Sequence, residues 1–191
     1  MGVGLSHLAH FLSVLVLHRL TQNVLSSKAN VHQAVSFIAA ALHVISPAGV
    51  FLSAPYAEPT FSLLNMTGYG IYLSALFDED AGRCFSRDVK FIVAGITFMA
   101  ATLVRSNGIL SGFLFAYDAA LGLAQIMSQG PSNNNIRRLC FVIAGGSIVS
   151  LGLIGPQYLA YKDYCTITSA SRPWCEQLIP SIYSWVQTHY W

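Results

Sequence analysis

The sequence predicts an all-α membrane protein, a polytopic bundle of about six transmembrane helices. Of its 191 residues, 54% are hydrophobic and only 9% are charged, and the mean hydropathy is +0.54. Soluble domains carry about 25% charged residues, so this composition cannot build a water-exposed surface. Apolar segments of the length needed to cross a bilayer, about 20 residues, recur along the chain. The net charge of +2 is too small to suggest a nucleic-acid partner.

Six segments have the apolar character of membrane spans. The first contains three histidines and lacks the basic start and cleavage site of a signal peptide, so we interpret it as a span. The fourth is short and starts beside Lys90, whose side chain can reach the interface. We expect a transmembrane bundle over residues 1–163 and a lumenal tail over residues 164–191. The segments are Val3–Leu20, Ala34–Ala54, Pro59–Phe77, Val89–Val104, Ile109–Met127 and Leu139–Leu159.

Basic residues are concentrated in alternate connections between these segments. The connections Arg19–Gln33, Asp78–Lys90 and Gln129–Arg138 hold seven of the ten lysines and arginines. Cytosolic loops carry an excess of such residues, so we place these connections in the cytosol. The other face is then extracellular or lumenal. Cys165 and Cys175 lie on that oxidising face and are a disulfide candidate.

The first polar break on the predicted lumenal face is a proline-rich turn. It runs from Ile45 to Pro59 and presents Tyr56 and Glu58. Proline interrupts helices, and irregular backbone in membranes survives where it lines protein or a wet cavity. The simpler interpretation is a tight turn in which Glu58 stabilises the start of the next helix.

The second break, Arg105–Gly108, lies between the fourth and fifth spans. A guanidinium at a membrane boundary suits a phosphate, because its planar donors pair with anionic oxygens. Ser106 and Asn107 add hydrogen-bonding groups at the next helix start, where exposed N–H groups favour anions. Alternatively, Arg105 reaches to the interface and Ser106 or Asn107 caps the helix. Gln157, near the end of the last span, is predicted on the same face.

Other polar residues and glycines lie inside the spans. Asp118 is the one carboxylate deep in a span, which makes it a functional candidate, and His43 at similar depth is its expected partner. We favour a structural pair that joins two helices. His7 and His10 share a helix face, but no third ligand is evident, so we expect no metal. Close helix packing is predicted at Gly145, Gly146, Gly152 and Gly155.

Three motifs together resemble the GPI mannosyltransferase 2 family, in its fungal form, over nearly the whole chain. They are S-P-A-G-V-F-L-S-A-P-Y-A-E-P-T-F-S-L-L at 46–64, V-R-S-N-G at 104–108, and the tail R-P-W-C…P-S-I-Y-S-W-V-Q-T-H-Y-W. The resemblance implies a multi-pass GT-C-type enzyme of the endoplasmic reticulum membrane. Such an enzyme transfers the second, α-1,6-linked mannose from dolichyl-phosphate mannose to the GPI-anchor precursor at the lumenal face. It implies no cofactor besides this donor, and as partners the two lipid-linked substrates, membrane lipid and a small membrane subunit.

The resemblance also implies an acidic catalytic base in a first lumenal loop, and this chain shows no such loop. The family continues beyond Trp191, so we expect an internal portion or a truncated gene product. Glu58 is the acidic residue on a lumenal turn between spans. It is the remaining candidate for the base, although a role in holding acceptor hydroxyls suits it better. We hypothesise that Arg105 contacts the donor phosphate and that Asn107, Tyr56 and Glu58 complete a substrate-binding site.

Two other functions remain open from the residues alone. A noncatalytic membrane subunit, or an inactive fragment, would bind the GPI precursor or a partner transferase, and the missing acidic loop favours this alternative. A small transporter would show inverted repeats and broken helices at mid-membrane depth. We find neither repeats nor breaks at that depth in the sequence.

Overall fold

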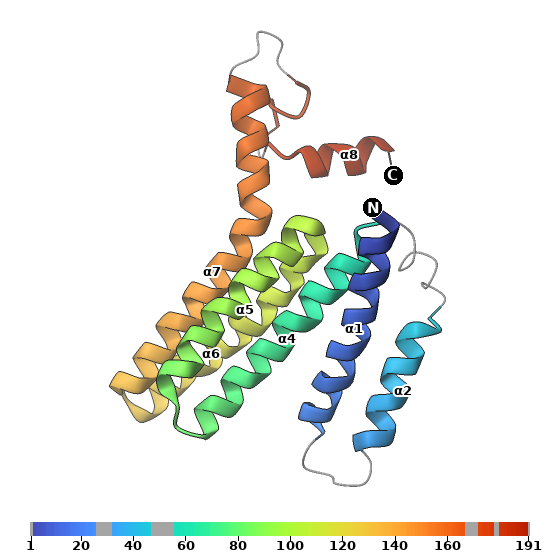
Figure 1. Cartoon of the computed structure of the whole chain (residues 1–191). Coiled ribbons are helices and arrows are strands. Elements are labelled where there is room, and N and C mark those ends of the chain that lie inside the picture. The colour runs from blue at the N-terminus through green and yellow to red at the C-terminus, as the bar shows by residue number, and fades with distance from the viewer. Residues whose placement is uncertain (1, 26–31, 47–55, 167–171, 178–179, 191) are drawn as a thin grey trace.

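The computed structural model describes residues 2–25, 32–46, 56–166, 172–177 and 180–190, and every regular element in these ranges is helical. The predicted all-α class is therefore confirmed for the described chain (Figure 1). In chain order the elements are α1 (Gly2–Val24), α2 (His32–Val44), α4 (Glu58–Asp80), α5 (Cys84–Val104), the short 3-10 helix η1 (Ser106–Ser111), α6 (Gly112–Gln129), α7 (Asn133–Tyr161), the π-helical turn η2 (Lys162–Thr166) and α8 (Ile182–Tyr190).

Within the described part of the chain, three helical stretches are long and apolar enough to cross a membrane, namely Gly2–Val24, Ser106–Gln129 and Asn133–Thr166. The described part of α2 is apolar but short, and residues 47–55, which cover the rest of the second predicted span, lie outside the described residues. The helices α4 and α5 carry polar or charged side chains along their length. The count of about six spans therefore stays a prediction, and so does the GT-C type.

Two connections predicted as long cytosolic loops are mostly helical. α4 continues to Asp80 and α5 starts at Cys84, which leaves a turn of three residues with Gly82 at φ 71°. α7 starts at Asn133, so the basic residues expected in a loop there lie on a helix. Helical backbone hydrogen bonds need no apolar side chain. Hydropathy therefore marks the apolar part of each helix and not its ends.

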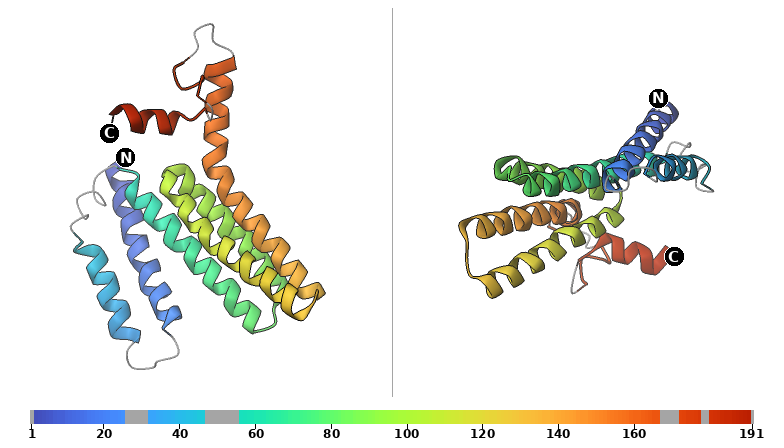
Figure 2. Two further views of the ribbon diagram at one scale, coloured as in Figure 1. Left: turned by 180° about the vertical axis from the view of Figure 1, so that it is seen from behind. Right: turned by 90° about the horizontal axis from the view of Figure 1, so that it is seen from below.

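The helices form a series of neighbours. α2 packs on α1, α1 on α4, α4 on α5, α5 on α7, and α7 on α6. Viewed from below, α1, α2, α4 and α5 form one layer and α6 and α7 form a second (Figure 2). α7 extends past the ends of α4 and α5, and α8 runs across the direction of α7 (Figure 1). The core of the bundle consequently lies between the two layers, where α5 packs on both α4 and α7.

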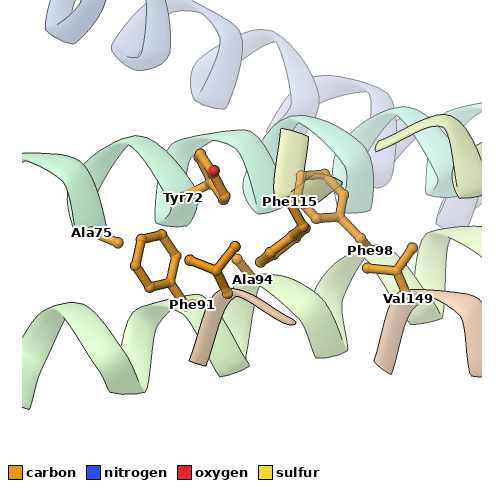
Figure 3. Close-up of a cluster of buried hydrophobic side chains, with 8 residues drawn as sticks. Tyr72, Ala75, Phe91, Ala94, Phe98, Phe115 and Val149 are labelled. Atoms are coloured by element: carbon orange, nitrogen blue, oxygen red, sulfur yellow. The ribbon is translucent and has the colours of Figure 1, made fainter. Parts of the chain in front are cut away.

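The core is a cluster of aromatic side chains with small residues between them (Figure 3). Phe115 of α6 meets the ring of Tyr72 edge-on, with 5.1 Å between centroids, and approaches Phe98 at 6.3 Å. Such edge-to-face pairs are preferred for aromatic rings, and each adds about 0.5–1.5 kcal/mol beyond burial. The other members are Ala75, Phe91, Ala94, Val142 and Val149. The cluster joins α4, α5, α6 and α7 around one centre.

Glycines allow α5 and α7 to approach backbone to backbone. A Cβ atom on Gly95 would lie 2.7 Å from the carbonyl oxygen of Gly145. A Cβ on Gly145 would lie 2.5 Å from an aromatic ring of α6, and one on Gly152 would lie 2.6 Å from a carbonyl oxygen of α5. The prediction of close packing is confirmed at these positions and at Gly146. It is wrong at Gly155, where a Cβ would have no neighbour within 4 Å, because Gly152, one turn earlier in α7, already meets the last turns of α5.

We predict that Gly95→Ala destabilises the bundle. The added methyl group would meet backbone, which cannot move aside as a side chain can, so we expect a loss of about 1–3 kcal/mol. Titration with sodium dodecyl sulfate in mixed micelles, followed by circular dichroism, measures this loss. Gly155→Ala is the matched control and should unfold like the parent chain. Equal stability of the two variants would contradict the close α5–α7 contact.

Candidate functional site

The polar turns predicted to share one face lie at the same end of the α4–α5 hairpin. α4 begins at Glu58, followed by Pro59, and a carboxylate at this position is favoured by the partial positive charge of a helix start. α5 ends at Val104, and Arg105 follows in an extended conformation with φ −148° and ψ 125°. Because α4 and α5 run antiparallel, the start of one helix and the end of the other are adjacent.

Arg105 and Glu58 form an ion pair at this end of the hairpin. The Arg105 Nη1 donates to Glu58 Oε1 at 2.9 Å, and the Arg105 Cζ lies 6.0 Å from the centre of the Phe61 ring. The Arg105 side chain is 43% exposed. A guanidinium carries five N–H donors, and this pair engages a single nitrogen. Donors on an exposed and oriented guanidinium therefore remain for an anion.

The other predicted binding residues lie on the same two segments. Tyr56 is exposed two positions before Glu58, and Asn107 is exposed within η1. The hydroxyl of Ser111 donates to Asn65 Oδ1 of α4 at 2.7 Å, which anchors η1 on the hairpin. The neighbouring residues 47–55 of the proline-rich motif lie outside the described residues. Ser106 and Asn107 lie within η1, so neither occupies a cap position: the N-cap residue is Arg105 for η1 and Ser111 for α6.

Gln157 lines a pocket whose described lining includes neither Arg105 nor Glu58. It lines an open, mainly apolar hollow of about 480 Å³ with Tyr158 and Tyr161 of α7 and Pro180 of the tail. This part of α7 extends past the ends of α4 and α5 (Figure 1). Sharing a predicted membrane face is therefore not sufficient to bring Gln157 into the site.

Asp118 has different partners from the one expected. The hydroxyl of Tyr72 on α4 donates to Asp118 Oδ2, and the Arg138 Nη2 on α7 donates to the same oxygen at 3.2 Å. The predicted pairing with His43 is wrong, since His43 lies on α2, which packs on α1, and its partners are on α1. Asp118 does join helices, as we interpreted, but it joins three of them.

The histidines of α1 and α2 meet each other instead. His43 Nε2 lies 3.1 Å from the Ser13 hydroxyl, and its ring lies 5.3 Å from that of His10. His7 is exposed. Within the described ranges, no three histidine, cysteine or acidic side chains gather as a metal site would require.

A network of ion pairs at the opposite end of the bundle was missed by the sequence reasoning. Arg87 and Asp88 are buried and paired, with Arg87 Nε donating to Asp88 Oδ1 at 2.9 Å. Arg137 Nε lies 2.5 Å from Asp88 Oδ2, and Arg138 Nε donates to Glu79 at 2.8 Å. These pairs connect the α4–α5 turn to the start of α7. The sequence did contain a signal for these pairs. The connection Asp78–Lys90 carries acidic residues, the connection Gln129–Arg138 carries arginines, and both were assigned to one membrane face.

Asp78 is the second acidic centre of this network. Lys90 Nζ lies 2.6 Å from Asp78 Oδ2, and Ser86 and Arg83 also donate to the carboxylate. These hydrogen bonds, that from Lys90 above all, hold the pKa of Asp78 well below its usual range. The carboxylate therefore stays charged at neutral pH and keeps the hairpin turn in place. The buried carboxylates at this end of the bundle each have more than one basic partner, whereas Arg105 has one carboxylate partner.

Cys165 and Cys175 are joined in a disulfide in the structure, with 5.7 Å between their Cα atoms. The bond connects η2, just after α7, to the tail. Cys84 is partly buried and Cys140 is exposed, and both are free thiols. The free thiols lie on helices, one at the start of α5 and one in α7.

The fold and the polar hairpin end define a helical membrane protein with a candidate anion site at one end of its bundle. The chain belongs to the mannosyltransferase (PIG-V) family, which it matches over residues 1–191. This confirms the family resemblance seen in the three sequence motifs.

Curated relatives named GPI mannosyltransferase 2 match the chain from end to end. The protein of Aspergillus oryzae is 53% identical over 190 residues, that of Aspergillus fumigatus 48% over 191, and that of Chaetomium globosum 40% over 206. Each alignment covers 100% of this chain but only 44%, 43% and 43% of the respective relative. The chain thus spans less than half the length of these relatives. No solved structure matches the fold.

We predict that the thiols of Cys165 and Cys175 react with an alkylating reagent only after reduction, if the tail faces an oxidising compartment. Mass spectrometry of alkylated chain from intact microsomes, with and without reductant, measures this difference. Cys140 is the internal control and should be labelled equally in both samples. Equal labelling of all cysteines without reductant would contradict the predicted orientation.

We also predict that Asp118→Asn lowers stability rather than the rate of any reaction. The change removes the charge that pairs with Arg138, but Arg138 still pairs with Glu79. We therefore expect the free energy of unfolding to fall by about 1–3 kcal/mol. Loss of a whole buried pair would cost about 3–5 kcal/mol. The same detergent titration measures it, with Asp80→Asn at an exposed position as the control. An unchanged unfolding midpoint would show that the Asp118 network is not structural.

Proposed function

We propose that this chain is part of a GPI mannosyltransferase that adds the second mannose, in α-1,6 linkage, to the GPI-anchor precursor. The donor would be dolichyl-phosphate mannose, and the reaction would occur at the lumenal face of the endoplasmic reticulum. Support comes from relatives named GPI mannosyltransferase 2 that align with all of this chain. The single structural observation behind the chemistry is the exposed Arg105 guanidinium held by Glu58.

In this proposal Arg105 binds the phosphate of the donor lipid. A hydroxyl oxygen of the acceptor attacks the anomeric carbon of the mannose, and the bond from that carbon to the phosphate oxygen breaks with inversion. The lipid phosphate leaves with additional negative charge, which the guanidinium stabilises through paired N–H donors. The hydroxyl proton passes to a general base that we assign to no described residue.

Glu58 is a positioning residue in this scheme. Its carboxylate accepts from Arg105 Nη1 at 2.9 Å and so orients the guanidinium at the hairpin end. Tyr56 and Asn107 are exposed beside this pair and would contact sugar or phosphate oxygens. Hydroxyl and amide groups supply the short-range hydrogen bonds that such ligands need.

Complementation tests the proposal as a whole. Cells that lack the second GPI mannose accumulate a precursor with one mannose, which mass spectrometry of the glycolipids detects. Expression of a longer form of this chain, with the length of its relatives, should restore the second mannose. If the longer form expressed well and restored nothing, the proposed reaction would be wrong. Restoration that needed a separate, unaltered transferase would instead support a noncatalytic subunit.

We predict that Arg105→Lys in the longer form reduces mannose transfer per folded molecule by about tenfold or more. Lysine keeps the charge but loses the planar fork, and a hydrogen bond to a charged group contributes about 1.5–3 kcal/mol. Initial rates at varied donor concentration in microsomes measure the effect, which should appear in donor use. Arg172→Lys in the tail is the control and should leave the rate unchanged. An unchanged rate of mannose transfer by the Arg105 variant would show that Arg105 does not bind the donor phosphate.

A further inference from the structure

A cleft lies between α1, α4 and α5, towards the end of the bundle predicted to face the cytosol. Its volume is about 400 Å³, within the range of roughly 300–1,000 Å³ typical of small-molecule pockets. Val16, Arg19 and Asn23 of α1, Gly70 and Ile71 of α4, and Lys90 of α5 are among its lining residues. Most of its lining surface is apolar. None of these residues belongs to the Arg105–Glu58 site.

The cleft is polar at one end and apolar at the other. Arg19 and Asn23 lie in the last turns of α1, and Lys90 lies in the second turn of α5, so all three are at the same end of the bundle (Figure 1). Val16 is seven residues before Asn23, which places it about 10 Å further along the helix axis. A ligand that fits both ends has a charged head and an apolar chain.

The two cations of the cleft differ in their contacts. The Lys90 ammonium group forms an ion pair with Asp78 and also contacts the Ser74 hydroxyl, which lies 2.7 Å from Nζ. Arg19 is exposed and, among the described residues, makes no ion pair. A guanidinium at the mouth of an apolar cleft is complementary to a phosphate. Acidic residues are absent from the described lining of the cleft.

We infer that this cleft binds an anionic glycerophospholipid of the cytosolic leaflet. The phosphate would contact Arg19, and an acyl chain would lie along the wall formed by Val16 and Ile71. Anionic lipids are enriched in that leaflet, and basic pockets between transmembrane helices bind their headgroups. Arg105 is fifteen residues after Lys90, about 22 Å along α5. The lipid site is therefore separate from the proposed donor site and independent of the transfer reaction.

A single substitution on the inner wall of the cleft can fill it selectively. A Cβ atom on Gly70 would meet no heavy atom within 4 Å, so the space beside it is the open cleft. Gly70→Leu would fill this space with an apolar side chain without changing any charge. Leucine also favours the helix more than glycine does, so the variant should fold. Gly155, on α7, has the same open surroundings and lies outside the cleft.

Native mass spectrometry of the purified 191-residue chain in detergent tests the inference. Palmitoyl-oleoyl phosphatidylserine is titrated, with the diacylglycerol of the same acyl chains, which lacks the phosphate headgroup, as the neutral comparison. We expect phosphatidylserine to bind at least about tenfold more tightly, the factor that one hydrogen bond to a charged group supplies. Arg19→Gln should remove most of that preference, and Gly70→Leu should weaken binding of both lipids. The controls Arg172→Gln and Gly155→Leu should match the parent chain.

Four results would overturn this assignment. Equal affinity for the two lipids would show that no headgroup is recognised. An unchanged preference in Arg19→Gln, or unchanged binding in Gly70→Leu, would place the lipid elsewhere. Tighter binding of dolichyl phosphate than of phosphatidylserine would assign the cleft to an isoprenoid phosphate instead. Circular dichroism of each variant establishes that an affinity change is not a loss of fold.

Discussion

A carboxylate inside an apolar helix has to be paired, and the pairing of Asp118 organises the centre of this bundle. Leaving such a charge unpaired in lipid or protein costs several kcal/mol. Asp118 on α6 therefore accepts hydrogen bonds from the Tyr72 hydroxyl on α4 and the Arg138 guanidinium on α7. Arg138 in turn pairs with Glu79 at the end of α4. Three helices are tied together at one depth, and none can rotate without breaking a pair.

The glycine contact between α5 and α7 is the second constraint, and it acts on shape instead of charge. Because Gly95 and Gly145 carry no side chain, the two backbones touch and Phe115 can enter the gap between layers. The hairpin of α4 and α5 is thus held at its middle by packing and at its turn by ion pairs. Its free end, where Arg105 meets Glu58, is positioned by a rigid support.

The two ends of the bundle use charge differently. At the hairpin turn, Asp78 and Asp88 are surrounded by basic partners, and the charges there serve the fold. At the other end, Arg105 is 43% exposed and engages a single carboxylate. Arg19 beside the α1–α4–α5 cleft is likewise exposed and makes no ion pair among the described residues. Buried carboxylates with several basic partners mark structural charges, and Arg105 and Arg19, which lie outside this network, are the guanidinium groups to which we assign anionic ligands.

The sequence by itself determined the helical class, the apolar centres of the helices, the shared end of Arg105 and Glu58, and close packing at Gly145. These follow from local composition and from the alternation of helix direction, which need no knowledge of neighbours. Only the tertiary structure decided the partners of Asp118, the separation of Gln157 from the site, and the ion pairs of Arg87 and Asp88. Those depend on which helices are adjacent and how each is rotated about its axis. Hydropathy carries no information on either, because lipid and protein interior are similarly apolar.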